Sequence, residues 1–302
     1  MVQTPYIAAM GEGGEPWVNG ASMNNQGVEF TVSFKSDPSS EFQWAVSANI
    51  GTYKTELTDL PSNVINKYAG DGVHDLILGR SPNSAYGLVA DGIFKTQEEV
   101  DAHADQPGKA VGRIRYKDLD GDGVINETYD RTWIGCYDPD FFGGLNFDFA
   151  YKGFDLNLFF EGMFGNDVNS DWKKESDIWL FTNPAWKNHA TRMLGGWSPD
   201  NPNSDIPAIS NNTANQEQRF SSWFIEDGSY IKLRNIELGY TFPTKLIKKM
   251  HMSNLRLYAA AYNVFTLKKF WGDDKYTSFD PERPSYHYLT PFTFNFGINV
   301  SF

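Results

Sequence analysis

Hydrophobic and polar residues alternate strictly at the carboxyl-terminal end of the chain, from position 291 to 302. The even positions are apolar: Phe292, Phe294, Phe296, Ile298, Val300 and Phe302. Successive side chains of a strand point to opposite faces, so this pattern predicts a strand with one apolar and one polar face. At about 3.3 Å per residue, such a tilted strand is long enough to cross the hydrocarbon core of a bilayer. A terminal aromatic residue, here Phe302, is typical of the closing strand of an outer-membrane β-barrel.

The same two-residue period recurs in six earlier segments. These segments are 28–34, 42–50, 145–151, 154–160, 236–242 and 255–266. The last of them is less regular, because Ala259, Ala260 and Ala261 make both faces small. Together with the terminal segment, the pattern predicts seven antiparallel strands.

Alternation alone favours a soluble β-sandwich, whose strands are also half buried, so the connections decide between the two folds. Short turns are predicted at 36–41, 152–153 and 243–254, whereas the connections at about 59–141, 166–228 and 267–290 are long. Following the strands up and down places all short turns on one rim and all long loops on the other. Outer-membrane barrels have short periplasmic turns and long extracellular loops. Such long connections are unusual in a compact soluble domain. The sequence therefore favours an all-β transmembrane barrel.

Composition excludes several other classes of protein. The formal net charge is −12, which argues against a nucleic-acid partner, because phosphates require a basic surface. No stretch is long and apolar enough for a transmembrane helix, and the mean hydropathy is −0.47. The single cysteine, Cys136, excludes an internal disulfide.

The sequence is expected to be the carboxyl-terminal part of a larger barrel. Its first residues lack the features of a secretory signal. Seven strands cannot close, because bacterial single-chain barrels have even strand numbers from about eight upward. Residues 2–9 are a candidate for part of an eighth strand, but loops this long are typical of much larger barrels.

Six stretches, in order along the chain, resemble the SusC/RagA-like TonB-linked outer-membrane transporters. They are NNQGVEFTVSF (24–34), GRIRYKDLDGDGVINETYDRTWIG (112–135), FFGGLNFDFAYKGFDLNLFFEGMFGND (141–167), SYIKLRNIELGYTFP (229–243), LRLYAAAYNVFTL (255–267) and FNFGINVSF (294–302). The resemblance implies the last strands of a barrel of about 22 strands, with a plug that is not in this sequence. It also implies TonB-driven uptake of glycan oligosaccharides or peptides, together with a SusD-like surface lipoprotein. The implied location is the outer membrane of a Bacteroidota-type bacterium, with outer-membrane lipids around the barrel.

One motif has the spacing of a calcium ligand set. Its candidate ligands are Asp118, Asp120, Asp122, the carbonyl of Val124, Asn126 and Asp130. Acids at relative positions one, three and five with a glycine at six reproduce the first part of an EF-hand loop. Tyr129 stands at position twelve, where a bidentate acid belongs, so Asp130 would have to replace it through a bulge. The alternative is an Asp/Gly-rich turn that caps itself with side-chain hydrogen bonds.

The remaining candidates indicate architecture more than chemistry. Six tryptophans lie in or beside the long loops: Trp172, Trp179, Trp186, Trp197, Trp223 and Trp271. Their rings suit packing of the loops, contact with a partner protein or contact with a sugar, and packing is the favoured interpretation. Thr96 and Glu99 form a capping box that predicts a short helix over 97–103. No recognisable catalytic motif is present, so we expect no enzyme.

Two other functions remain open at this point. One is a soluble, secreted β-sandwich that binds a ligand and is stabilised by calcium. The other is a siderophore or cobalamin receptor, which would share the barrel but not the Asp-rich loop or the SusD-like partner.

Overall fold

The computed structural model describes most of the chain. The described residues are 2–3, 17–18, 20–61, 68–71, 74–178, 189–210, 214, 216–268, 277–284 and 288–302. Within these ranges no helix has the length and apolarity needed to cross a membrane.

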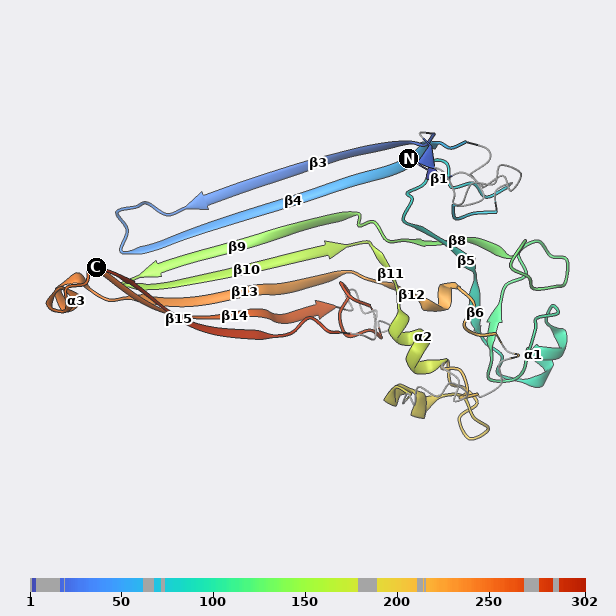
Figure 1. The fold of residues 1–302 in the computed structure, drawn as a ribbon. Coiled ribbons are helices and arrows are strands. Elements are labelled where there is room, and N and C mark those ends of the chain that lie inside the picture. The colour runs from blue at the N-terminus through green and yellow to red at the C-terminus, as the bar shows by residue number, and fades with distance from the viewer. Residues whose placement is uncertain are drawn as a thin grey trace, which may run out of the picture.

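Seven long antiparallel strands form one twisted sheet (Figure 1). They are β3 (Ser22–Lys35), β4 (Phe42–Asp59), β9 (Phe141–Tyr151), β10 (Phe154–Phe164), β13 (Tyr230–Thr241), β14 (Asn254–Lys268) and β15 (Thr293–Ser301). Their order in the sheet follows their order in the chain, with β3 and β15 at the two edges. The seven predicted strands are therefore confirmed. The strands form a single open layer, which is a barrel wall and not the two packed layers of a sandwich.

The strand register gathers the apolar residues on one face. One row of paired residues crosses all seven strands: Phe34, Val46, Phe147, Leu158, Ile236, Ala261 and Phe294. The adjacent row on the opposite face runs through Lys35, Ala45, Asp148, Asn157, Glu237, Ala260 and Asn295. The alanines that obscured the sequence pattern are thus assigned: Ala261 lies on the apolar face and Ala260 on the polar face.

The connections differ sharply between the two ends of the sheet. Figure 1 shows all three short turns and the carboxyl terminus at one end. At the tightest turn, Lys152 and Gly153 have φ of 48° and 88°, the positive values that a two-residue type I′ hairpin requires. The longest of the three contains α3 (Thr244–Ile247) and η6 (Lys248–Met250). The backbone N–H of Ser253 donates to Ser301 at 2.8 Å, which fixes the last strand and hence Phe302 at this end.

The amino-terminal residues do not extend the large sheet. Val2–Gln3 (β1) pairs with Trp17–Val18 (β2) in a separate two-stranded sheet. The candidate eighth strand at 2–9 is therefore absent from its described part, residues 2–3, and the remainder lies outside the described residues.

The first two long connections fold together instead of forming separate loops. We call their described residues, within 60–140 and 165–229, the loop module. Its strands are β5 (Ser84–Leu88), β6 (Ala90–Ile93), β7 (Ile114–Tyr116), β8 (Arg131–Cys136), β11 (Asp167–Asn169) and β12 (Ile225–Asp227). Its helices are α1 (Gln97–Ala102), α2 (Asp171–Asp177), η3 (Thr191–Gly195) and η5 (Ser222–Phe224). The Oγ1 of Thr96 accepts a hydrogen bond from the Glu99 N–H at 3.3 Å, so the predicted cap of α1 is confirmed.

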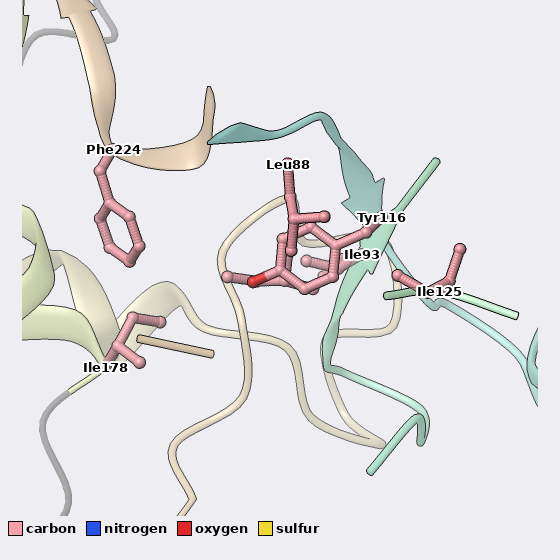
Figure 2. Packing of buried hydrophobic residues seen from close by; sticks show 7 residues of the cluster. Leu88, Ile93, Tyr116, Ile125, Ile178 and Phe224 are labelled. Atoms are coloured by element: carbon pink, nitrogen blue, oxygen red, sulfur yellow. The ribbon is translucent and has the colours of Figure 1, made fainter. Parts of the chain in front are cut away.

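The loop module has a hydrophobic core to which both connections contribute (Figure 2). Leu88, Ile93, Ile114, Tyr116 and Ile125 come from the first connection, and Ile178 and Phe224 come from the second. A buried ion pair adds to this contact: Arg113 lies 2.7 Å from Glu217, and both side chains are 6% exposed. The Glu217 carboxylate also accepts the backbone N–H of Ile114 at 2.9 Å.

Candidate functional site

The Asp-rich loop forms a compact carboxylate cluster at the surface of the loop module. Carboxylate oxygens of Asp118, Asp120 and Asp130 all lie within 4.8 Å of one another. Asp122 is not a member of this group, although the spacing of the motif predicted it. Asp130 is a member of the group, although it stands one residue beyond position twelve of the motif. Tyr129, at position twelve, is 59% exposed.

Backbone amides hold these carboxylates in place. Asp118 accepts hydrogen bonds from the N–H of Gly121 at 2.7 Å and of Gly123 at 2.9 Å. Both glycines have positive φ, 76° and 84°, which lets the loop curl around the carboxylate. The fully buried Asp130 accepts from the N–H of Leu119 at 2.8 Å and of Asn126 at 2.7 Å.

The shifts in the pKa values of Asp118 and Asp120 indicate a site that holds more than one negative group. Burial raises the pKa of Asp118, but hydrogen bonds from Gly123 and Gly121 outweigh it and lower this pKa below its ordinary value. The Asp122 N–H lowers the pKa of Asp120, but burial and the nearby carboxylates of Asp122 and Asp130 raise it above its ordinary value. Carboxylate oxygens are the ligands that Ca²⁺ prefers, so the donor chemistry fits a hard cation.

The Asp-rich loop is attached to the core of the module. Ile125 is 2% exposed and belongs to the hydrophobic cluster of Figure 2. Asp105 pairs with the same stretch, because its N–H donates to Gly123 at 2.7 Å and its carbonyl accepts from Ile125 at 2.9 Å. The amide oxygen of Asn126 accepts from the N–H groups of Thr128 and Tyr129 at 2.9 and 3.0 Å. Ordering this loop therefore orders part of the module.

A second cluster, which the sequence did not predict, lies on the polar face of the sheet near the long connections. We call it the ionic cluster: Glu161, Lys232, Arg234, Asp280 and Glu282. Lys232 is 1% exposed and lies 3.1 Å from Asp280 and in direct contact with Glu282. Arg234 binds Glu161 at 2.8 Å and also contacts Glu282. The cluster ties the described segment 277–284 to the sheet.

A bulge in β13 makes this cluster possible. The pairing of β13 with β10 shifts at this point, because the neighbours Phe159 and Phe160 pair with Asn235 and Leu233, so Arg234 is the extra residue. Asn263 on β14 has a φ of 55°, and its side chain donates to the carbonyl of Pro291 at 3.1 Å. The extra residue of a bulge shifts the alternation of side chains between the two faces of the sheet. Arg234 therefore reaches Glu161 on the polar face.

The tryptophans that the structure describes pack against neighbouring groups. Trp197 and Trp223 lie against the core of the loop module. Lys173 sits 4.7 Å from the ring of Trp223, and the ring of Trp172 lies 4.6 Å edge-on from Phe279. Trp179, Trp186 and Trp271 lie outside the described residues.

Comparison with known proteins adds relatives but no family model, since none matches the chain. TonB-dependent receptor P3 of Formosa agariphila is 30% identical over 302 residues, covering 94% of this chain and 29% of that protein. TonB-dependent receptor SusC of Bacteroides thetaiotaomicron is 26% identical over 297 residues, covering 94% of this chain and 27% of that protein.

A solved structure of the RagAB peptide transporter has the same fold. It matches with a TM-score of 0.74 at 22% identity, covering 99% of this chain and 32% of that chain. The chain thus spans less than a third of the length of the curated relatives named here.

Proposed function

We propose that this chain forms part of the wall of an outer-membrane nutrient importer, because it is a SusC/RagA-like portion of a TonB-dependent receptor β-barrel. TonB-dependent receptors of this type are outer-membrane proteins and not enzymes. The observation that carries the proposal is the apolar row across all seven strands, backed by a polar row on the other face. Such a wall fits lipid outside and an aqueous lumen inside.

The orientation follows from the two ends of the sheet. Short turns belong at the periplasmic rim and long connections at the extracellular rim of such barrels. The loop module and the segment 277–284 would then face the outside of the cell. They would meet a SusD-like lipoprotein and an incoming oligosaccharide or peptide, while TonB would supply the energy.

The test uses the full-length receptor with an affinity tag, in its own bacterium. We expect it in the outer-membrane fraction, with a SusD-like lipoprotein co-purifying, and we expect growth on the imported nutrient to require TonB. Recovery in the soluble periplasmic or secreted fraction would contradict the proposal and favour a soluble binding module.

We also propose that the Asp-rich loop binds Ca²⁺ and thereby stabilises the loop module. Asp118, Asp120 and Asp130 would supply carboxylate oxygens, with the Val124 carbonyl, Asn126 or water completing a shell of about six to eight ligands. Support comes from the grouping of these three carboxylates and from the contact of Ile125 with the core. A cation that binds only the folded loop stabilises it.

Removing calcium with a chelator is expected to increase hydrogen exchange across residues 105–130. At a calcium concentration about 100 times Kd, the loss is about 2.7 kcal/mol of local stability. Asp120→Asn should weaken the protection by calcium. Asp122→Asn is the matched control, because its carboxylate lies outside the cluster, and it should have a smaller effect. Identical exchange with and without calcium would refute the site.

A further inference from the structure

The longest of the three short turns carries a concentration of positive charge. It spans residues 243–253 (PTKLIKKMHMS), and we call it the basic turn. It contains no acidic residue, although the formal net charge of the chain is −12. Its three lysines, all exposed, are Lys245, Lys248 and Lys249. None of them has an ion-pair partner within the part of the chain that the structure describes, whereas Lys152 in the turn between β9 and β10 lies 3.0 Å from Glu41.

The basic turn is folded over one buried side chain and presents its other side chains to the surroundings. Ile247 is 2% exposed, whereas Leu246 is 63% and Met250 59% exposed. Lys245 and Lys249 are each two residues from Ile247, and side chains at this spacing in a helix do not face the same way. The turn therefore holds its lysines away from the sheet, with two exposed apolar side chains beside them.

A row of large apolar residues, most of them aromatic, lies next to this turn. Six strands contribute successive paired partners to it: Phe42, Tyr151, Phe154, Tyr240, Leu257 and Ile298. The row lies on the apolar face of the sheet, at the end with the short turns. Girdles of aromatic residues lie at the membrane–water interfaces of outer-membrane barrels. In the barrel proposed above, this row therefore marks the periplasmic interface.

The basic turn begins directly beyond this row. The ring of Phe242 packs on that of Tyr240 with 5.0 Å between centroids, and Lys245 follows three residues later. The polar layer of each leaflet is about 5–8 Å thick. As a helix, residues 244–250 span no more than about 10 Å. Lysine side chains also reach polar groups through their aliphatic stems. The three lysines thus lie at the depth of the lipid phosphates.

An anionic phospholipid fits this surface better than other anionic partners do. Lysines beside exposed apolar side chains are typical of segments that lie in a lipid–water interface. The lysines complement phosphate, and Leu246 and Met250 continue the lipid-facing surface of the sheet. Cell-wall carboxylates would account for the lysines but leave both apolar side chains in water. A soluble acidic protein would have to displace lipid headgroups beside the aromatic row.

We propose that the basic turn binds the headgroup of an anionic phospholipid in the periplasmic leaflet. The proposal rests on the importer function for the orientation of the barrel in the membrane. Lys245, Lys248 and Lys249 donate hydrogen bonds to the phosphate oxygens, while Leu246 and Met250 insert among the first carbons of the acyl chains. This contact holds the periplasmic rim at a fixed depth in the bilayer.

Native mass spectrometry of the purified full-length receptor in detergent tests this, with phosphatidylglycerol and phosphatidylcholine titrated separately. Both lipids contain a phosphate, but only phosphatidylglycerol has a net negative charge. We expect phosphatidylglycerol to bind more tightly. Lys245→Gln/Lys248→Gln/Lys249→Gln should weaken its binding about tenfold or more, since each lysine near an anionic lipid surface contributes about fivefold. Binding of phosphatidylcholine should not change.

The matched control is Lys54→Gln/Lys95→Gln/Lys117→Gln. It removes the same charge from the opposite end of the sheet and from the loop module, and it should keep the preference for phosphatidylglycerol. Leu246→Ser/Met250→Ser is a second variant, which should weaken the binding of both lipids to the same extent. The substituted positions of the basic turn are exposed, so each variant should keep the gel mobility of a folded barrel.

Equal affinity of the receptor for the two lipids would overturn the proposal. So would an unchanged affinity for phosphatidylglycerol in the triple lysine variant, or an equal loss in the control, which would indicate a response to total charge. An acidic periplasmic protein lost from the triple variant, with lipid binding unchanged, would assign the turn to a protein partner instead. Failure of the importer function is a separate result, since it appears as a receptor absent from the outer membrane.

Discussion

Arginine at position 296 is expected to prevent assembly of the full-length receptor in the outer membrane, whereas arginine at 295 is expected to be tolerated. Phe296 is 78% exposed on the apolar face, paired with Ala259 near the middle of β15. Asn295 is paired with Ala260 on the polar face. A cationic side chain facing lipid at the bilayer midplane costs about 2–4 kcal/mol, but one in the lumen remains hydrated.

Outer-membrane yield and the heat-dependent mobility of the folded barrel on gels measure this difference. Phe296→Leu is the matched control, because it keeps an apolar side chain at the same position and should assemble normally. Equal assembly of Phe296→Arg and Asn295→Arg would mean that β15 does not separate lipid from water, and the barrel orientation would be wrong.

Replacing Lys232 by Met is expected to release the segment 277–284 from the sheet. Lys232 is almost completely buried, and its ammonium compensates Asp280 and Glu282. Removing one partner of a buried ion pair costs about 3–5 kcal/mol, because the remaining charge is left uncompensated. Hydrogen exchange or limited proteolysis of 277–284 in the assembled receptor measures the release.

The matched control for this prediction is Lys54→Met. Lys54 forms an ion pair with Glu56 at 2.6 Å, but its side chain is 77% exposed, so the loss should be about 0–1 kcal/mol. Adding Asp280→Asn to Lys232→Met should restore part of the protection, because it removes an uncompensated carboxylate. Unchanged protection of 277–284 in Lys232→Met would show that other contacts hold this segment.

The strands were predictable because each carries its own signal. Period-two alternation is local, so Phe294, Phe296 and Ile298 reveal an apolar face without any knowledge of their neighbours. The loop module was not predictable from such a pattern. Leu88 and Ile125 meet Ile178 and Phe224 in one core, although these residues lie far apart in the sequence. Neither connection has enough apolar periodicity of its own to indicate this packing.

The candidate sites were likewise predictable from the sequence only in part. The spacing of Asp118 and Asp120 and the substitution by Asp130 were readable from the sequence, but the position of Asp122 outside the cluster was not. The ionic cluster was not predictable, because Glu161 meets Lys232 through strand register and Glu282 reaches Lys232 from the last long connection. The bulge at Arg234 also shifts the alternation of side chains along β13, so that Lys232 and Asn235 lie on the same face of the sheet. The only local sign of the ionic cluster in the sequence is the pair of basic residues, Lys232 and Arg234, on either side of Leu233.

The two edge strands of the open sheet have a practical consequence for handling this chain by itself. Each of β3 and β15 has a long row of backbone N–H and C=O groups that no other strand of the described residues covers. Such rows are templates for strand addition, and the apolar face beside them has no water-soluble cover. Produced alone in aqueous buffer, residues 1–302 should therefore stack edge to edge into insoluble assemblies with increased thioflavin fluorescence. The chain should therefore be purified in detergent, within a longer protein whose other strands pair with β3 and β15.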